Sequence, residues 1–416
     1  MTPGRALIAA ASTLVVLLPV SASAQIHMRP AAPKVEFPTG VDTVEMPLVL
    51  DGHLVTVPVV LGGQELAFVL DTGASSMALV DSKWIEILGL NVIGQAQLAG
   101  AGGGTAITVD LVGPVSLDIG GLKVERDMLA AGFGDALGHF TWDGIFGAGV
   151  LSQTVAEIDY ESSVVRFHDP ESFEMPPDAI VLPTMLMNSG IAAVEATITI
   201  DGQESTHWLA VDIGAFHSLS LDAEGLSRPL PTRRLPDATT IGWGVQGEVR
   251  GAVGVIDKLR LGPIELHDVI TTFPDRDGMH GVSRIGGDIP VIGNLGSAIL
   301  RNYTVIVDHP NQRLGLLPRQ TAARPFYFNT TGISARPMPT EGRLPIHEVI
   351  ANSPAAEAGL IAGDVILEVN GKPVEAHGGA LRGLLMDPGL GERLELIIER
   401  DGERMEVTLQ ARRLVG

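Results

Sequence analysis

The sequence predicts an all-β protein built from two similar β lobes, followed by a smaller α+β domain. Apolar and polar residues alternate over many short segments, which is the pattern of strands with one buried face. Several features recur in the same order between residues 45 and 318, which indicates an internal duplication. The pattern changes after a linker at residues 319–325, so residues 323–416 are expected to form a separate domain.

The segment 1–24 has the form of a cleavable secretory signal. Arg5 precedes an apolar run over residues 6–20, and Ala22-Ser23-Ala24 stands before Gln25. The apolar run is too short to span a bilayer comfortably, so we expect no stable membrane insertion after cleavage. An uncleaved anchor is the alternative reading of the same segment.

The amino-acid composition restricts the cellular compartment and the binding partners that we expect for this protein. The 416 residues include no cysteine, which excludes disulfides, thiolate nucleophiles and cysteine metal sites. Export without disulfides suggests that the protein is located in a bacterial periplasm. Secretion out of the cell is the alternative. The formal net charge is -21, which argues against nucleic acid and anionic membranes as partners because both attract basic surfaces.

Residues 25–44 contain three prolines and are expected to form an extended linker. The first lobe, predicted over residues 45–178, opens with a β-hairpin whose turn is Gly62-Gly63-Gln64-Glu65. Its second strand ends in the apolar run Phe68-Val69-Leu70 and then in Asp71. Gly73 permits a tight turn there, so one carboxylate is placed on a buried, rigid strand end.

The second lobe, predicted over residues 179–322, repeats this order. A hairpin with the turn Asp201-Gly202-Gln203-Glu204 leads to a strand that ends in Asp212. Two further pairs of features follow Asp71 and Asp212 at similar distances along the chain. They are the Gly-rich runs 100–104 and 242–247, and Ile145-Phe146-Gly147 with Val291-Ile292-Gly293.

Together these features resemble the aspartic proteases of the pepsin and retropepsin type. The resemblance implies two retropepsin-like β-barrel lobes whose carboxylates, Asp71 and Asp212, share a proton and activate water against a peptide bond. The implied substrate is a polypeptide, and neither a metal nor a cofactor is required. The implied supporting residues are Thr72, Gly73, Ser75 and Gly214, and the implied flap and substrate-binding residues are Gly102, Gly103, Trp243 and Gly244.

The second Asp turn departs from the family pattern. Ile213 stands where Thr or Ser is usual, and Phe216 stands where the first lobe has Ser75. The family pattern directs the Thr72 hydroxyl across to the other turn and the Ser75 hydroxyl to the outer oxygen of Asp71. Because such donors favour the ionised form, we expect Asp71 to be the charged base and Asp212 the protonated acid.

The C-terminal region closely resembles a PDZ domain. Ser353-Pro354 begins a short helix within residues 349–360, and residues 363–371 read as a buried strand closed by an Asn-Gly turn. The resemblance implies capture of a peptide C-terminus or an internal peptide by strand addition. The candidate peptide-binding loop holds Gly332, Ile333 and Ser334.

The function that follows is an exported aspartic endopeptidase with a peptide-binding module. A rival from another class is a catalytically silent scaffold in which the PDZ domain alone binds peptides. A third arrangement pairs Asp71 of one chain with Asp71 of another. The run 242–247 fits a dinucleotide-binding pattern but lacks a following helix, no Gly-Xaa-Ser-Xaa-Gly occurs, and the histidines lack helical metal spacing.

Overall fold

The computed structural model describes residues 16–19, 32–134, 141–275, 283–321, 325–335, 342–378 and 380–416. The predicted signal segment and the start of the predicted linker lie outside these ranges, apart from strand β1 (Val16–Pro19), which pairs antiparallel with β8. Within the predicted linker, β2 (Lys34–Glu36) pairs with β11. No helix in the described ranges has the length and apolar character needed to cross a membrane.

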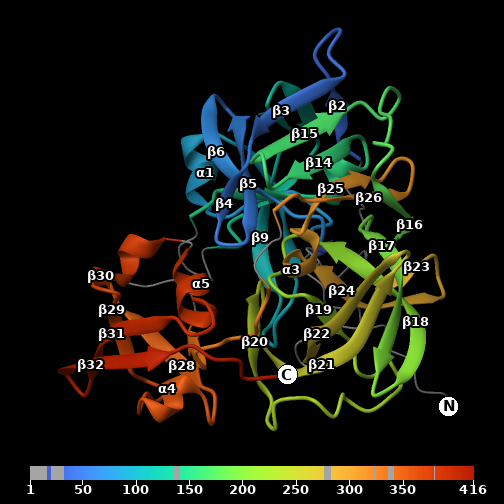
Figure 1. The fold of residues 1–416 in the computed structure, drawn as a ribbon. Helices are drawn as coiled ribbons and strands as arrows, with labels where there is room; N and C mark the ends of the chain where they lie inside the picture. Colours follow the sequence, from blue (N-terminus) through green and yellow to red (C-terminus); the bar gives the residue numbers. More distant parts are fainter. Residues whose placement is uncertain are drawn as a thin grey trace, which may run out of the picture.

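The protein is mostly β, and its strands form three sheets (Figure 1). The first sheet has 12 strands and contains the Asp71 turn. It comprises β1, β2, β4 (Val49–Asp51), β5 (Leu54–Leu61), β6 (Gln64–Leu70), β7 (Ala78–Leu79), β8 (Val92–Ala99), β9 (Ile107–Val112), β10 (Val115–Ile119), β11 (Leu122–Arg126), β12 (Leu129–Ala131) and β13 (Gly144–Phe146), with the short helices α1 (Lys83–Ile87) and α2 (Ala148–Leu151).

The second sheet has 14 strands and contains the Asp212 turn. It comprises β3 (Thr43–Pro47), β14 (Val155–Asp159), β15 (Val164–His168), β16 (Ile180–Leu186), β17 (Ala192–Ile200), β18 (Gln203–Asp212), β19 (Leu219–Leu221), β20 (Thr239–Gly244), β21 (Gly247–Leu261), β22 (Ile264–Pro274), β23 (Ser283–Ile285), β24 (Ile289–Gly296), β25 (Tyr303–Asp308) and β26 (Arg313–Pro318), with α3 (Ser297–Leu300).

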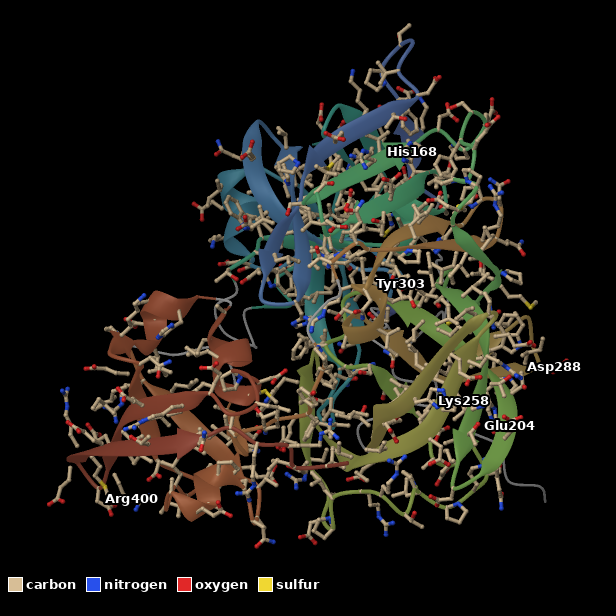
Figure 2. The ribbon with its side chains drawn as sticks, viewed as in Figure 1. His168, Glu204, Lys258, Asp288, Tyr303 and Arg400 are labelled. Atoms are coloured by element: carbon tan, nitrogen blue, oxygen red, sulfur yellow. The ribbon has the colours of Figure 1, made fainter. Side chains whose placement is uncertain are left out.

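Strands from both halves of the chain meet in this second sheet. β14 pairs with β25 and with β15, and β15 pairs with β3. The predicted boundary between residues 178 and 179 therefore divides a sheet to which both sides contribute. In Figure 2, Tyr303 at the start of β25 lies near the middle of the molecule, whereas Glu204, Lys258 and Asp288 lie along its outer side. This shared sheet joins the two halves of the chain.

The same strand pairing supports both Asp turns. β13 runs parallel to β6, with Phe146 opposite Leu70, and β24 runs parallel to β18, with Leu295 opposite Val211. The backbone bonds beyond these pairs also correspond, because Ala148 N donates to Ala74 O and Ser297 N donates to Ala215 O. The counterpart of Ile145-Phe146-Gly147 in the second lobe is thus Asn294-Leu295-Gly296.

The sequence-based choice of Val291-Ile292-Gly293 as that counterpart was wrong by three residues. Its apolar side chains match Ile145 and Phe146 better than Asn294 does, so the pattern favoured it. The register of the β18–β24 pair also shifts between Trp208 and Ala210, so the pairing on one side of the shift does not predict the pairing on the other. The residue that breaks the apolar pattern, Asn294, is the one that touches the site described below.

The third sheet has six strands and forms the C-terminal domain, drawn in orange and red in Figure 1. Its core holds Ile333, Ile346, Leu385 and Leu396. The domain comprises β27 (Ile333–Ala335), β28 (Leu344–Val349), α4 (Pro354–Glu357), β29 (Val365–Val369), β30 (Lys372–Pro373), the 3-10 helix η2 (Val374–His377), α5 (Ala380–Met386), β31 (Arg393–Arg400) and β32 (Glu403–Gln410).

The C-terminal domain packs directly against the second lobe. An apolar cluster joins Val253 and Ile270 of the second lobe to Phe328, Ile350 and Val415 of the C-terminal region. Full burial of each such side chain contributes roughly 1.5–3 kcal/mol. The seam between the domains is therefore a packed interface rather than a flexible tether.

Candidate active site

The first carboxylate of the site is held by the turn that ends β6. Asp71 is buried, its backbone amide donates to Phe146 O at 2.9 Å, and Gly73 N donates to Asp71 Oδ1 at 2.8 Å. The apolar run of β6 buries the strand, and the parallel neighbour β13 anchors its end. The sequence therefore places this carboxyl group on a rigid base.

The second carboxylate faces the first across the two turns. Asp212 is fully buried, and each carboxyl group lies against the glycine of the opposite turn. A Cβ at Gly73 would lie 2.6 Å from Cγ of Asp212, and a Cβ at Gly214 would lie 2.4 Å from Cγ of Asp71. Both glycines are required because any side chain there would displace the opposite carboxylate.

Thr72 connects the two turns through its hydroxyl group, as the family resemblance implied. Its Oγ1 donates to Val211 O at 2.7 Å and accepts from Ile213 N at 2.9 Å. The side chain of Ile213 is fully buried and has no hydroxyl to return the contact. The bridge between the turns thus comes from Thr72. Ser75 is half-buried beside the first turn, and its expected bond to Asp71 stays a prediction.

Burial raises the pKa of both carboxyl groups. The pKa of Asp71 is raised well above its ordinary value by burial and by the charge of Asp212. Burial also raises the pKa of Asp212, but a hydrogen bond from Asn294 opposes this rise. The Asn294 donor favours the ionised form of Asp212, and the sequence-based assignment of Asp71 as the base did not include this donor.

Asn294 supplies the donor that Ile213 and Phe216 lack. Its Nδ2 donates to Asp212 Oδ2 at 2.8 Å, and its Oδ1 accepts from His217 Nε2 at 3.0 Å. Neither residue was chosen from the sequence as a site residue. The only signal was a polar residue next to an apolar run, and its place beside Asp212 depends on the register of β18 and β24.

Another residue missed from the sequence is His53, at the tip of the β4–β5 hairpin. Its Nε2 lies 3.2 Å from Gly214 O, and its ring centroid lies 4.8 Å from that of Phe216. Phe216 also meets Phe326 edge-on, with centroids 5.5 Å apart. The second Asp turn is thus enclosed by aromatic rings from three parts of the chain.

The two Gly-rich runs form hairpin tips that hold one another. Gln246, at the tip between β20 and β21, donates its backbone amide to Ala101 O and accepts at its carbonyl from Gly104 N, both at 2.8 Å. Its side chain accepts from Gly100 N and donates to Gly104 O. In Figure 1, β9 descends from the first lobe toward β20, in agreement with these contacts. We call these contacts the clasp.

The predicted flap glycines take part in this close approach. A Cβ on Gly102 would lie 2.4 Å from the backbone of Gln246, and one on Gly244 would lie 2.2 Å from Ala101 O. Gly103 N donates to Glu248 O at 3.1 Å. The clasp therefore needs glycine on both hairpins, which explains the two Gly-rich runs.

Trp243 contacts the C-terminal domain. Its ring meets that of His347 edge-on at a centroid distance of 5.2 Å. His347 Nε2 lies 3.0 Å from Glu248 Oε2, and Glu348 Oε1 lies 3.1 Å from Arg250 Nη2. The hairpin that forms one side of the clasp is thus bound along its length by β28.

The predicted peptide-binding loop of the C-terminal domain is buried and bonded to its own chain. Gly332 N donates to Asn329 Oδ1 at 3.0 Å, and Ile333 N donates to Thr331 Oγ1 at 3.2 Å. Ser334 is 2% exposed. A peptide terminus that binds these amides must first displace Asn329 and Thr331.

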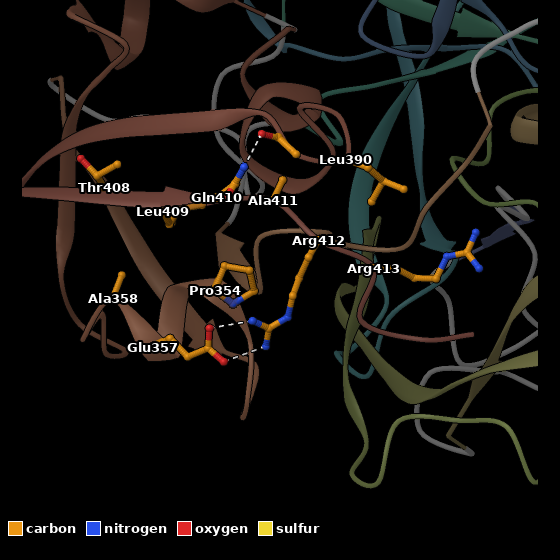
Figure 3. Close-up of a pocket in the computed structure, with 11 residues that line it drawn as sticks. Pro354, Glu357, Ala358, Leu390, Thr408, Leu409, Gln410, Ala411, Arg412 and Arg413 are labelled. Atoms are coloured by element: carbon orange, nitrogen blue, oxygen red, sulfur yellow. Dashed lines mark hydrogen bonds and ion pairs between the residues drawn. The ribbon is translucent and has the colours of Figure 1, made fainter.

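A small cavity lies at the seam between the second lobe and the C-terminal domain. It is lined by Phe216 and His217 from the second Asp turn, and by Asn329, Met386 and Asp387 from the C-terminal domain. A wider, open groove lies on another face of the C-terminal domain, between α4 and β32, where Figure 3 shows Arg412 paired with Glu357. Among the described residues, no group of three or more His, Asp or Glu side chains is arranged to hold a metal ion.

Comparison with known proteins matches two parts of the chain. Residues 57–150 match the family model for aspartyl protease, and residues 346–400 match the PDZ domain model. "Periplasmic serine endoprotease DegP" of Escherichia coli (strain K12) is 42% identical over 65 residues, which are 16% of this chain and 14% of that protein. "Probable periplasmic serine endoprotease DegP-like" of Marinomonas sp. (strain MWYL1) is 41% identical over 69 residues, again 16% and 14%. The chain thus spans about a seventh of the length of these curated relatives.

Proposed function

We propose that this chain, which carries an aspartyl protease domain followed by a C-terminal PDZ domain, is an exported endopeptidase. The carboxyl groups of Asp71 and Asp212 would activate the water that hydrolyses a peptide bond of the substrate. The observation that carries the proposal is the pair of buried carboxyl groups that face each other across two turns, each against the glycine of the opposite turn. Two such groups share one proton, so the site holds an acid and a base together.

The Asn294 donor supports a proposed division of roles within the pair. Asp212, which accepts from Asn294, acts as the base, and Asp71 acts as the acid. As water bonds to the carbonyl carbon, Asp212 takes a water proton and Asp71 gives its proton to the carbonyl oxygen. On collapse, one hydroxyl proton returns to Asp71, Asp212 protonates the leaving nitrogen, and the C–N bond breaks. Both carboxyl groups end as they began.

The clasp sets the condition for substrate entry. An extended polypeptide that enters between the hairpins must break the bonds between Gln246 and the Gly100–Gly104 run, each worth roughly 0.5–1.5 kcal/mol. It can replace them with strand-like bonds to the same hairpins. We therefore propose that substrate binding and opening of the clasp are coupled.

The two lobes are proposed to arise by internal duplication. The parallel pairs β6–β13 and β18–β24 support this, as do the equivalent bonds that follow each Asp turn. A complete second turn within one chain disfavours the pairing of Asp71 with Asp71 of another chain. We propose the domain limits 45–178, 179–322 and 323–416 for the two lobes and the PDZ domain.

The PDZ domain is proposed to bind a peptide terminus or an internal peptide by strand addition to β27, which lies at the end of its sheet. Export to a periplasm is proposed from the signal-like segment, the absence of cysteine and the partial likeness to proteins named as periplasmic. A silent scaffold remains the second candidate, because Ile213 removes one hydroxyl of the family pattern and the two hairpin tips are bonded to one another.

Hydrolysis of an unstructured protein tests the proposal against the scaffold. The chain without residues 1–24 is incubated with a reduced, unfolded protein from about pH 3 to pH 8, beside Asp71→Asn as a matched control. Cleavage by the wild type and not by the variant supports the peptidase. Binding of C-terminal peptides without cleavage at any pH supports the scaffold.

A further inference from the structure

We propose that His217 and Asn294 form a positioning pair that holds Asp212 as the ionised member of the catalytic pair. This inference rests on the proposed peptidase function and adds the residues that decide which carboxyl group carries the proton. Both residues act on Asp212 from its own lobe, Asn294 directly and His217 through Asn294.

The position of Asn294 in the sheet is the first observation. It lies opposite Ala210, two residues before Asp212, whereas its counterpart Ile145 lies opposite Val69, two residues before Asp71. Asn294 is 7% exposed, so a polar amide replaces an apolar side chain at an equivalent buried site. A buried amide is unfavourable unless both of its ends are bonded, and here both are.

The direction of the amide group is the second observation. Oδ1 of Asn294 can only accept, so its contact with His217 Nε2 requires the tautomer in which Nε2 carries the proton, and Nδ2 is left to face Asp212. An ionised carboxylate can only accept hydrogen bonds. If the amide were turned over, its oxygen would face the Asp212 oxygen and its NH₂ group would face the imidazole. His217 therefore fixes the orientation in which Asp212 is stabilised as an anion.

Gly296 makes room for this arrangement. A Cβ at Gly296 would lie 2.7 Å from Cδ2 of the His217 ring and 2.1 Å from its carbonyl oxygen. The glycine that follows Asn294-Leu295 thus serves the positioning pair as well as the turn. The ring of His217 also lines the cavity at the seam with the PDZ domain.

The charged and titratable groups around the pair come from four places. Asp71 faces Asp212 from the first lobe, and His53 bonds to Gly214 O of the second turn. His217 lies beyond Asn294, and Asp387 lines the same cavity as His217 from the PDZ domain. Beside these groups, Asn294 bonds directly to Asp212 as an uncharged donor, so its replacement by an apolar residue changes no formal charge.

The pH profile of hydrolysis distinguishes positioning from simple packing. In Asn294→Ile, which copies Ile145, the anion of Asp212 loses its side-chain donor, so the acid limb of the kcat/KM profile is expected to rise by about one pH unit. The alkaline limb reports loss of the proton from Asp71. Asp212 is ionised both before and after that step, so loss of its donor should not move this limb.

The opposite assignment gives the opposite result. If Asp71 were the ionised member, loss of the donor would leave the acid limb unchanged and raise the alkaline limb. That outcome, or two unshifted limbs in an active variant, overturns the proposal. His217→Leu should reproduce the acid-limb shift in part. His217→Gln keeps a donor, so its acid limb should stay at the wild-type pH.

Controls separate this proposal from folding defects and from the proposed function. Asn302→Leu removes a part-buried amide that donates to Ala298 O and Ile299 O, and it should lower stability without moving either limb. If Asn294→Ile does not fold, the His217 variants carry the test. Hydrolysis that persists in Asp71→Asn refutes the peptidase function itself, whereas unshifted limbs with Asp71 essential refute only the positioning pair.

Discussion

Glu348 of the PDZ domain binds Thr240 of the clasp hairpin through one carboxylate oxygen. Its Oε2 accepts from the backbone amide of Thr240 at 2.7 Å and from the hydroxyl at 2.9 Å, and Thr239 Oγ1 donates to the same oxygen at 2.8 Å. A module that is expected to bind peptides thus holds one of the hairpins that cover the proposed cleft.

Loss of this contact should loosen the hairpin. In Glu348→Ala the amide of Thr240 loses its acceptor, and we expect the free energy of unfolding to fall by roughly 1–3 kcal/mol. Amide hydrogen exchange over residues 239–250 should become faster. Glu395→Ala, at an exposed site of the same domain, is the matched control. Unchanged exchange in Glu348→Ala would show that the PDZ domain does not restrain the hairpin.

Loss of the clasp should ease substrate entry. Gln246→Ala keeps the backbone bonds to Ala101 and Gly104 but removes the two side-chain bonds to Gly100 and Gly104. We expect a lower KM for long peptides with kcat nearly unchanged, because opening the hairpins becomes easier. Gln95→Ala removes an exposed side-chain bond on the first hairpin and should leave KM unchanged. A raised KM in Gln246→Ala would mean that this residue binds substrate rather than restrains the clasp.

A single methyl group at Gly73 should abolish activity. The new Cβ of Gly73→Ala would lie 2.6 Å from Cγ of Asp212, so the two carboxyl groups must separate. Since both are needed to share the proton, we expect kcat to fall by at least about 10²-fold. Gly94→Ala, whose new Cβ meets its nearest atom at 4.0 Å, is the control. Normal hydrolysis by Gly73→Ala is incompatible with the proposed site.

The packed seam predicts that the PDZ domain stabilises the second lobe. Phe328 is 3% exposed within the cluster that joins them, so Phe328→Ala should lower the free energy of unfolding by roughly 3–5 kcal/mol. Exposed Met405→Ala, in the same domain, should change it little. Chemical denaturation measures both. If the PDZ domain unfolds separately and Phe328→Ala affects only its transition, the seam does not couple the domains.

The raised pKa of Asp71 predicts a pH-dependent stability. A carboxyl group whose pKa is higher in the folded protein favours folding below its ordinary value of 3.8, and this contribution is lost as the pH rises through the folded pKa. Asn cannot ionise, so Asp71→Asn does not lose this contribution. The melting temperature of the variant should therefore increase relative to that of the wild type as the pH rises above about 4. Calorimetry at several pH values tests this, and a difference that is constant with pH would contradict the raised pKa.

Local features of the site could be predicted from the sequence. The run Phe68-Val69-Leu70 before Asp71 predicts a buried strand, and Gly73 predicts the turn, because both depend on neighbouring residues. The contact between the Thr72 hydroxyl and the second turn followed from the resemblance to the family pattern. In the PDZ domain, Ser353 caps a helix that begins at Pro354, as its dipeptide indicates.

The remaining features depend on contacts between distant segments. Asn294 reaches Asp212 only because β24 and β18 pair in a register that the apolar pattern misassigns by three residues. Gln246 meets Ala101 from the other lobe, and Glu348 meets Thr240 from another domain. No local pattern specifies such partners. The proposed order of ionisation differs from the sequence-based one for the same reason, since it depends on the Asn294 donor.

The most direct test of the account is the rate of peptide hydrolysis with either carboxyl group replaced. Single-turnover rates for a fluorogenic peptide are compared for the wild type, Asp71→Asn and Asp212→Asn across the pH range, with circular dichroism to show that each variant is folded. The account predicts that each replacement lowers the rate by at least about 10²–10⁴-fold at every pH. A folded variant of either kind that hydrolyses the peptide at the wild-type rate would contradict it.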